Sequence, residues 1–471
     1  MAAGRETSSV SRDFPKLRFS AGADRTPANI GKVKKMCELI REHQPQATIV
    51  VGGHIANKEG LADIISVDQI VKGEGVRWFR KYLGLDPDKP VKHPAVISGF
   101  ETRILGHTLR EKPGDTAAML IPSVGCPLGC NFCSTSALFG GKGKSVNFFE
   151  TGDELFAEMV RLENELAVKS FFIMDENFLF HRKRALRLLA LMEEHDKSWA
   201  LNVFSSARVL KSYTMEQLIG LGIGWVWMGL EGKQSQYAKL SGIDTRKLVS
   251  DLQANGIRVL GSSIIGLEEH TPENIDAVID HAVSHKSVFH QFMLYTPIPG
   301  TPLYEKHRQD GTLFGEAQIA AADTHGQYRF NYAHRHIPEG EEEGYLLNAF
   351  KRDFQINGPS LARLVRVLLV GWQKYKHHPQ ARIRKRFDFE VDGLRSSYAG
   401  AVWAMRQKYR REPKLFAVLS VLLKDICEEF GWKTRLVAPL VGSYLLIAIK
   451  LEERRLAMGR TLEPECFYEK T

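Results

Sequence analysis

Apolar positions in the first 84 residues alternate between helical spacing and short continuous runs. The pattern predicts a helix, a strand, a second helix and a second strand over residues 28–44, 47–51, 58–66 and 68–71. Ile30, Val33 and Cys37 share one face of the first helix. This order indicates part of a doubly wound α/β domain over residues 25–84, preceded by a loose polar segment over 1–24.

The alternation becomes regular from residue 116 onward. Apolar strands are predicted at 117–122, 170–174, 200–205, 224–230, 257–265 and 289–295. Helices are predicted between them at 151–166, 181–195, 213–221, 244–255 and 272–285. Continuous apolar strands are typical of parallel sheets that are covered on both faces. We therefore expect a partly closed (β/α)6 barrel over residues 116–310, with ligands at the carboxyl ends of the strands.

Two further regions flank this barrel. Residues 85–115 contain Pro and Gly and are expected to form a connector, whereas residues 311–471 are expected to be mainly helical. The apolar run Leu436–Ile449 is interrupted by Pro439 and Gly442 and is shorter than the roughly 18 residues of a membrane-spanning helix. It fits either a buried helix hairpin or a helix that lies on a membrane surface.

The composition is that of an ordinary globular protein, with 44% hydrophobic and 25% charged residues and a formal net charge of +9. No dense basic run concentrates this charge. We therefore expect a solvated surface and no nucleic-acid partner, with a patch for phosphate or anionic lipid as the alternative. The six cysteines do not form a disulfide framework, and the N-terminus lacks the apolar stretch of a signal peptide. These features predict a cytoplasmic protein.

Three of the cysteines directly follow the first predicted barrel strand. The run Gly125-Cys126-Pro-Leu-Gly-Cys130-Asn-Phe132-Cys133 has the spacing C-x3-C-x2-C, so three thiolates can surround one metal centre from a single loop. A closed zinc site needs four ligands, and the next cysteines along the chain are the distant Cys37 and Cys427. A [4Fe-4S] cluster that keeps one iron open fits this loop better than zinc does.

The loop resembles the cluster motif of the radical S-adenosylmethionine (radical SAM) superfamily, in which an aromatic residue precedes the last cysteine. Phe132 occupies that place. The resemblance implies that Cys126, Cys130 and Cys133 hold a [4Fe-4S] cluster and that SAM chelates its open iron. It also implies that one electron, from a donor such as flavodoxin or ferredoxin, cleaves SAM. The resulting 5′-deoxyadenosyl radical abstracts hydrogen from an unactivated C–H bond.

Polar motifs follow the next two strands in the order that this superfamily shows. Asp175 and Glu176 resemble the acidic segment that holds the SAM ammonium group, although acids also stabilise the start of any helix. After the third strand, Ser205 is implied as a partner of the ribose. Arg208 is implied as a partner of the SAM carboxylate, with an ordinary surface arginine as the alternative.

The last strands carry further parts of the resemblance. Glu231, in Gly229-Leu230-Glu231-Gly232, is similar to a family segment that offers a polar ligand. The fifth strand ends Ile264-Ile-Gly266, similar to a strand whose backbone lies on the adenine, and Gly266 would permit that approach. The match spans about residues 116–305. The expected fold class is thus α/β, with a radical SAM partial (β/α)6 barrel between a truncated doubly wound domain and a helical region.

The N-terminal region resembles the C-terminal half of a cobalamin-binding (B12-binding) domain, which precedes the barrel in one large subgroup. The turn Gly52-Gly53 and the run Gly73-Glu74-Gly75 carry this resemblance, which implies that Gly52 and Gly53 lie near the nucleotide tail of cobalamin. The first strand and helix of that domain, with its Asp-x-His-x-x-Gly motif, are missing. Either the chain begins late or the domain is vestigial. We expect His54 to be a loop residue rather than a cobalt ligand.

The subgroup resemblance implies methyl transfer to an unreactive carbon or phosphorus atom. The alternatives are rearrangement or cyclisation without methyl transfer, an RNA methylthiotransferase, and an inactive metal-binding regulator. The lone Cys37 near the N-terminus disfavours the RNA enzyme, and the intact cysteine loop disfavours the inactive protein. We expect the helical region to cap the substrate side. Its apolar stripes raise the hypotheses of a lipid-like substrate, such as a hopanoid or isoprenoid, and of a peripheral membrane contact.

Overall fold

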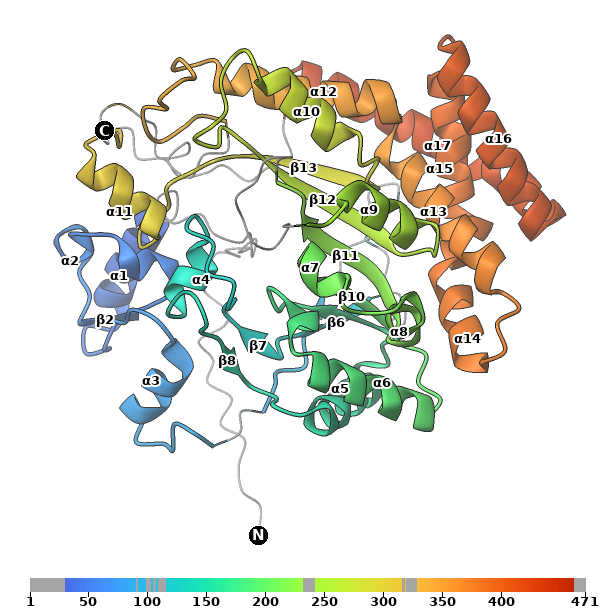
Figure 1. Cartoon of the computed structure of the whole chain (residues 1–471). Coiled ribbons are helices and arrows are strands. Elements are labelled where there is room, and N and C mark those ends of the chain that lie inside the picture. The colour runs from blue at the N-terminus through green and yellow to red at the C-terminus, as the bar shows by residue number, and fades with distance from the viewer. Residues whose placement is uncertain are drawn as a thin grey trace.

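The computed structural model describes residues 30–89, 92–98, 103–104, 107–108, 116–231, 242–315, 318 and 328–460. Figure 1 shows an N-terminal α/β unit and the helices α13–α17 on opposite sides of a central barrel. The expected α/β class, with a parallel barrel and a helical C-terminal region, is confirmed. The predicted loose segment at 1–24 lies outside the described residues, and the proposed domain limits stay predictions.

The barrel strands pair in chain order and are all parallel. They are β6 (Ala117–Leu120), β9 (Ser170–Ile173), β10 (Ala200–Phe204), β11 (Ile223–Gly229), β12 (Arg258–Ile265) and β13 (Phe289–Leu294). Each predicted strand is present, with bounds within two residues of those expected. A short strand, β3 (Ile97–Ser98), adds antiparallel to β6 inside the predicted connector. Two residues are too few to give a period, so the sequence pattern could not show this strand.

Helices cover the outer face of the barrel. They are α5 (Gly152–Leu166), α6 (Arg182–Glu194), α7 (Ala207–Leu210), α8 (Met215–Gly220), α9 (Thr245–Gln253), α10 (Ile275–Val283) and α11 (Pro302–Gln309). Capping boxes begin two of them: Thr151 pairs with Glu154 at α5, and Thr214 pairs with Gln217 at α8. These boxes satisfy backbone N–H groups that have no partner inside the helix and so fix where each helix starts.

The two faces of the barrel strands differ in burial. The outward side chains are at most 1% exposed and pack beneath the helices: Phe171, Ile173, Leu201, Val203, Val226 and Met228. The inward side chains of the same strands are only half-buried: Phe172, Asn202, Phe204, Trp225 and Trp227. Successive residues of a strand point to opposite faces, which separates the two sets. The barrel interior therefore keeps accessible surface.

The C-terminal helices are α12 (Glu342–Asn357), α13 (Ser360–Tyr375), α14 (Ala381–Glu390), α15 (Ser397–Lys408), α16 (Pro413–Phe430) and α17 (Trp432–Ala457). On α14, Arg382 donates to the Gly220 carbonyl (2.7 Å) and Arg386 to the Ile219 carbonyl (3.2 Å), both just before β11. On α13, Arg363 donates to the Val288 carbonyl just before β13 (3.1 Å).

Helices α13 and α14 thus pack on the amino ends of the strands, whereas residues 328–346 pack near Ile265 and Gly266 at the carboxyl end of β12. The expectation that the region caps the substrate side is wrong for α13 and α14, because helical periodicity shows which face of a helix is apolar and not which end of a barrel it meets.

Helix α17 corrects a second expectation. Residues 432–457 form one continuous helix that runs through Pro439, so the predicted hairpin is wrong. By length and composition alone this helix could cross a membrane, and only 17% of its most apolar 18-residue window is buried. It packs along α15, where Gly442 lies against the Gly400 carbonyl.

The N-terminal unit consists of α1 (Ile30–His43), β1 (Val50–Val51), η2 (His54–Asn57), α2 (Leu61–Ile64), β2 (Gln69–Ile70) and α3 (Gly75–Tyr82). Strands β1 and β2 pair in parallel, and Val51, Leu61 and Ile65 form a small core. The unit packs on the barrel at Gly300, where an added Cβ would lie 2.8 Å from the Asn57 side-chain nitrogen. Gly300 therefore gives the N-terminal unit room to approach.

Candidate cluster and cofactor site

A small hairpin carries the cysteine loop at the carboxyl end of β6. Strand β7 (Ser123–Val124) pairs antiparallel with β8 (Val146–Asn147), and the loop between them leads into α4 (Ser134–Leu138). Gly125 and Gly129 have φ of 85° and 66°, which L side chains rarely adopt. A Cβ on Gly125 would lie 2.7 Å from the Phe139 Cβ, and one on Gly129 would lie 2.7 Å from the Lys142 Cα. Both glycines are needed for the loop to fold this tightly.

The three thiols share this loop and one electrostatic environment. The Cys133 sulfur caps α4 and accepts from the Ser136 N–H (3.4 Å), while the Ser136 hydroxyl donates to the Cys126 carbonyl (2.8 Å). Cys126 is buried, whereas Cys130 and Cys133 are half-buried. Burial raises the pKa of Cys126 to about 11, with further upward contributions from Cys133, Cys130 and the nearby Glu176 carboxylate.

The arrangement bears on the choice between a cluster and a single ion. Within the described part of the chain, no three His, Cys, Asp or Glu side chains converge closely enough to hold one metal ion. The choice between zinc and a cluster therefore rests on the spacing of the three cysteines rather than on a preformed ligand cage. Three thiols spread around a loop suit a [4Fe-4S] cluster, because each thiolate then binds a different iron. The role of Cys126, Cys130 and Cys133 as cluster ligands stays a prediction.

The loop is fastened to the last two barrel strands. The Asn131 side chain donates to the Tyr295 hydroxyl (3.0 Å), and the Phe132 and Tyr295 rings meet edge to face at 6.0 Å. Phe132 packs on a cluster formed by Ile264, Leu267, Tyr295 and Leu303. Ile264 therefore lies directly behind the cysteine loop, and Phe132 serves as its apolar anchor.

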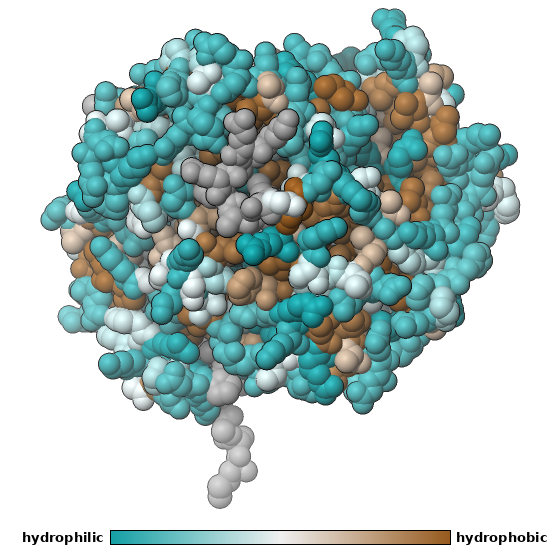
Figure 2. Space-filling model, in the orientation of Figure 1, coloured by the Kyte–Doolittle hydropathy of each residue, from teal (hydrophilic) through white to brown (hydrophobic). Residues whose placement is uncertain are grey.

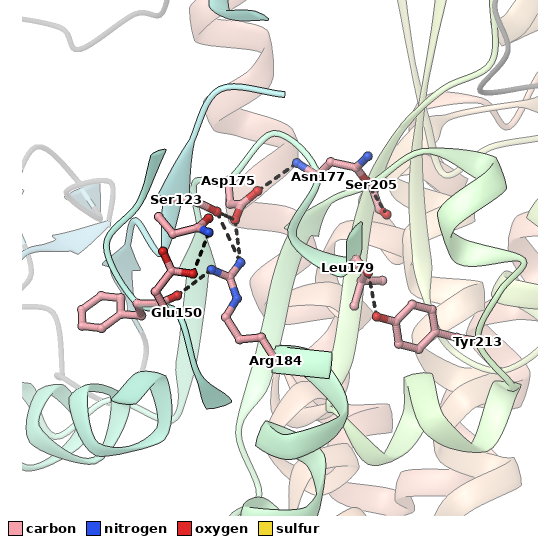
Figure 3. Close-up of polar contacts among 10 residues, drawn as sticks. Ser123, Glu150, Asp175, Asn177, Leu179, Arg184, Ser205 and Tyr213 are labelled. Atoms are coloured by element: carbon pink, nitrogen blue, oxygen red, sulfur yellow. Dashed lines mark hydrogen bonds and ion pairs between the residues drawn. The ribbon is translucent and has the colours of Figure 1, made fainter. Parts of the chain in front are cut away.

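The two acids after β9 have different roles in the structure. Asp175 is 3% exposed, and its Oδ2 accepts from the buried Arg184 of α6 (3.0 Å) and from the Ser123 hydroxyl. Its Oδ1 accepts from the Asn177 N–H (3.0 Å), as Figure 3 shows. Asp175 thus forms a buried ion pair within the fold, and its proposed contact with the SAM ammonium stays a prediction. Glu176 is half-buried beside Cys126 and keeps its proposed role.

The network continues to the end of β10. The Ser205 hydroxyl and the Ser206 N–H both donate to the Asn177 Oδ1, each at 3.1 Å. Ser205 is 4% exposed and donates its proton to Asn177, so it could contact a ribose only as an acceptor, and that contact stays a prediction. Asn177 thus joins two strand ends, a role the sequence pattern did not single out.

Arg208 and Glu231 keep their candidate roles as predictions. Arg208 is exposed on α7 and forms no ion pair among the described residues, so its guanidinium is available to a carboxylate. Glu231 is buried at the end of β11 with a positive φ of 45°, and its N–H donates to the Ser262 carbonyl (3.4 Å). A positive φ at a residue with a side chain is an uncommon backbone state that is more frequent at functional sites.

Gly266 is needed for a different reason from the one expected. Its φ is 83°, its N–H donates to the His270 Nδ1 (3.0 Å) and its carbonyl accepts from the Tyr332 hydroxyl (3.3 Å). A Cβ there would clash with the ring of Phe330. The space above Gly266 is thus filled by Phe330 from the segment 328–340, and the structure does not leave that side open to adenine.

An aromatic wall lines the inside of the barrel and was not anticipated from the sequence. We define it as Phe172 of β9, Phe204 of β10 and Trp227 of β11. The ring centroids of Phe172 and Phe204 are 5.9 Å apart, and those of Phe204 and Trp227 are stacked at 5.0 Å. All three rings are half-buried. Aromatic residues at alternate positions of consecutive strands were the sequence feature that could have predicted this wall.

The barrel is closed below the aromatic wall. Trp225 lies two residues before Trp227 on β11, and Phe289 is the first residue of β13. Both residues pack on the core of the C-terminal helices. The interior is therefore blocked at the amino ends of the strands. The half-exposed wall therefore lies on the side of this closure that leads toward the cysteine loop.

The predicted cobalamin turn lies beside the cysteine loop. Gly52 and Gly53 are exposed after β1, and Gly53 has a φ of 78°. The next element, η2, packs on α4, and Gly73 faces the Leu138 carbonyl (3.7 Å from an added Cβ). The exposed glycine backbone is compatible with a closely approaching nucleotide tail. The contact of Gly52 and Gly53 with cobalamin stays a prediction, and His54 lies in η2.

Comparisons with known proteins find similar methyltransferases. No family model matches the chain. It is 29% identical over 197 residues to the bacteriochlorophyllide d C-12(1)-methyltransferase of Chlorobaculum tepidum, which covers 40% of this chain and 42% of that protein. It is 28% identical over 312 residues to an uncharacterized methyltransferase of Pyrococcus horikoshii, covering 58% of this chain and 65% of that protein. The chain thus spans less than two thirds of the length of these curated relatives.

Among solved structures, the radical S-adenosylmethionine methyltransferase TsrM from Kitasatospora setae, with cobalamin and a [4Fe-4S] cluster bound, is 15% identical. It superposes with a TM-score of 0.48 over 77% of this chain and 84% of that chain. The sequence motifs, the strand order and the curated methyltransferases support the radical SAM resemblance without this superposition. By these observations the chain is similar to curated methyltransferases, and its parallel barrel with a three-cysteine loop is the arrangement that the radical SAM resemblance implies.

Proposed function

We propose that this protein is a radical SAM enzyme that transfers a methyl group to an unreactive atom of a largely apolar small molecule, with cobalamin as its second cofactor. One observation carries the proposal: a loop of three thiols lies at the carboxyl end of a parallel barrel whose inner wall is half-exposed and aromatic. Chemistry at the carboxyl ends of the strands is the general rule for such barrels.

The chain offers a distinct group for each part of the cofactor pair. Cys126, Cys130 and Cys133 would hold the cluster, and metal binding favours the thiolate form of the buried Cys126 thiol. Once bound, the cluster and SAM supply a carbon radical that can take hydrogen from an unactivated C–H bond. Glu176, which lies near Cys126, would bind the ammonium group, and the exposed Arg208 would bind the carboxylate.

The aromatic wall supports the substrate class. Three adjoining rings offer a flat apolar surface on which a planar or polycyclic molecule can stack. Because Trp225 and Phe289 close the lower end, a substrate would enter from the cysteine side and present its upper part to the radical. With a substrate stacked on it, the wall would keep water from the reacting atoms and so limit quenching of the radical.

The cobalamin part of the proposal rests on the N-terminal turn. Gly52 and Gly53 would lie along the nucleotide tail, next to α4 and the thiol loop. In the described residues the sheet of this unit has only β1 and β2, which leaves a short crevice. We therefore expect cobalamin to bind this unit weakly.

Turnover by the full chain tests the proposal. Anaerobically reconstituted protein is supplied with SAM, a reductant and an extract of apolar metabolites, with and without added cobalamin, and the products are analysed by mass spectrometry. We expect 5′-deoxyadenosine in both reactions, and a product heavier by one methylene group that depends on cobalamin. Protein without iron serves as the control.

Two results would contradict parts of this proposal. Absence of 5′-deoxyadenosine would remove radical SAM chemistry. A product isomeric with its substrate would replace methyl transfer with rearrangement or cyclisation.

A further inference from the structure

Helix α17 has two faces of opposite character. Thr434, Ala438 and Gly442 are buried on the side that packs against α15. On the other side, five large apolar side chains are more than half exposed: Trp432 (67%), Leu436 (60%), Leu440 (73%), Ile447 (60%) and Leu451 (59%). Spacings of four and seven residues place these five along one stripe of the helix, which we call the outer stripe.

The outer stripe is too continuous to be ordinary surface. Single exposed apolar residues are normal, but a contiguous exposed patch on a protein marks a surface that meets another apolar phase. In Figure 2, apolar surface is visible in the part of the molecule where Figure 1 places α13–α17. The elements that would cover such a stripe in a folded core are on the opposite side of α17, at α15.

Charge at the two ends of the outer stripe indicates what covers it. Lys433 and Arg435 flank its first residue, and Lys450, Arg454 and Arg455 flank its last. The acids at that end are already engaged: Glu453 pairs with Lys408, and Glu452 with Arg455 at 3.7 Å. Cations therefore dominate both ends of the apolar stripe, with Trp432 beside one of them.

We propose that α17 docks this protein on the surface of a bilayer that carries anionic headgroups. The helix lies parallel to the membrane, with the outer stripe at the boundary of headgroups and acyl chains and the flanking Lys and Arg side chains among the phosphates. An apolar stripe, terminal cations and an aromatic residue at the edge are the features by which amphipathic helices bind such interfaces.

The packing of α17 distinguishes this arrangement from a membrane span. A Cβ on Gly442 would lie 2.7 Å from the Gly400 carbonyl of α15, so the two helices are in close backbone contact along the buried face. One face of α17 thus stays with the protein while the other is free for lipid. Because α17 belongs to the helical region at the amino ends of the barrel strands, the docking surface is separate from the thiol loop and does not depend on the proposed reaction.

Vesicle sedimentation of the full chain tests the proposal. Vesicles are made of phosphatidylcholine alone or with one third phosphatidylglycerol. We expect strong binding only to the anionic vesicles. The triple variant Leu436→Ser, Leu440→Ser, Ile447→Ser should bind at least about tenfold less, since each change removes a large apolar side chain from the interface. Lys450→Glu with Arg454→Glu should also weaken binding about tenfold by removing attraction to the lipid charge.

A matched control uses other exposed apolar positions. Leu347 and Ile356 of α12 are 53% and 59% exposed, and changing both to Ser should alter binding less than twofold if the outer stripe is the docking surface. Binding of the triple variant equal to that of the unchanged protein, or no binding to anionic vesicles, would overturn the proposal. So would a dimer of the unchanged protein that the triple variant converts to a monomer without any vesicle binding, because a second copy would then cover the stripe.

Discussion

The two ends of the barrel treat their polar groups differently. At the amino ends of the strands, Glu390 is 4% exposed at its side chain and lies between Arg258 and Arg386, with its Oε2 at 3.0 Å from the Arg386 Nε. At the carboxyl ends, Asp175 and Arg184 also form a buried pair, but Cys130 and Glu176 are half-buried and Arg208 is exposed. The upper end thus differs from the lower end by holding, beside a buried ion pair, a thiol and a guanidinium that are at least partly exposed.

This contrast separates stability from chemistry within one fold. A paired charge at the lower end joins the C-terminal helices to the barrel, so its loss should weaken folding and spare the reaction. A thiol at the upper end holds little of the fold together, so its loss should spare folding and stop the reaction. Barrels of this kind generally divide their two ends in this way.

The largest expected effect is the loss of one thiol at the upper end. Cys130→Ala should lose its iron and reduce SAM cleavage to the background rate, because a cluster held by two thiolates is not retained. Cys427→Ala, at a buried thiol of α16 in the lower region, should keep both iron and cleavage. Iron analysis and 5′-deoxyadenosine formation measure the outcome. Cleavage by Cys130→Ala at the rate of the unchanged protein would refute the cluster assignment.

The next effect concerns the paired charge at the lower end. Glu390→Gln should lower the free energy of unfolding by about 3–5 kcal/mol, since Arg258 and Arg386 would be left buried without a counter-charge. SAM cleavage per folded molecule should not change. Asp388→Asn on the same helix is the control: its pair with Arg395 is exposed, so a change below about 1 kcal/mol is expected. Denaturant titration of both variants measures this, and equal losses would contradict the distinction.

Strand β9 allows a sharper comparison between a core side chain and a side chain of the inner wall. Phe171 of β9 points outward and is fully buried, whereas Phe172 points inward and is half-buried. Phe171→Ala should cost about 3–5 kcal/mol of stability by opening a cavity. Phe172→Ala should cost about 1–2 kcal/mol, because less surface is lost, and should raise KM for the substrate while leaving SAM cleavage intact. The reverse order of stabilities would mean that the inner wall is core rather than a binding surface.

Much of the fold could be predicted because each barrel strand is a continuous apolar run of its own. The same patterns could not show that α14 meets the amino ends of the strands, since that contact is made by Arg382 and Arg386, which look like surface residues in sequence. Likewise, Pro439 suggested a break in α17, yet the helix continues through it.

The candidate site was only partly predictable for a related reason. A motif shows which residues follow a strand, but not which way each side chain turns. Asp175 and Glu176 are neighbours, yet one pairs with Arg184 and the other lies beside Cys126. Gly266 was expected to receive a ligand, but it receives Phe330 from a segment 64 residues further along the chain. Contacts between distant segments leave no local pattern.

A further effect, seen only at acid pH, is a pH dependence at the upper end. His270 is 2% exposed, and its Nδ1 accepts from the N–H groups of Gly266 (3.0 Å) and Leu267 (3.1 Å). Burial, with a smaller contribution from His334, lowers the pKa of His270 from 6.5 to about 4. The folded state therefore resists protonation, which would also remove the acceptor of both N–H groups.

The sign of the effect follows from this pKa. Above pH 6.5 the imidazole is neutral in both the folded and the unfolded states, so it has no effect on stability. As the pH falls from 6.5 toward 4, the unfolded chain binds a proton that the folded chain does not, and stability is lost, by about 2 kcal/mol at pH 5. In His270→Asn the amide oxygen can accept hydrogen bonds from the same N–H groups without titrating. Between pH 7.5 and pH 5 the variant should therefore lose about 2 kcal/mol less stability than the unchanged protein.

The matched control is His195→Asn, at an exposed position, and denaturant titrations at the two pH values measure the stability of all three proteins. An equal loss in all three would show that His270 does not set the acid sensitivity of the β12 end, and that the upper end of the barrel is as tolerant of protonation as the rest of the fold.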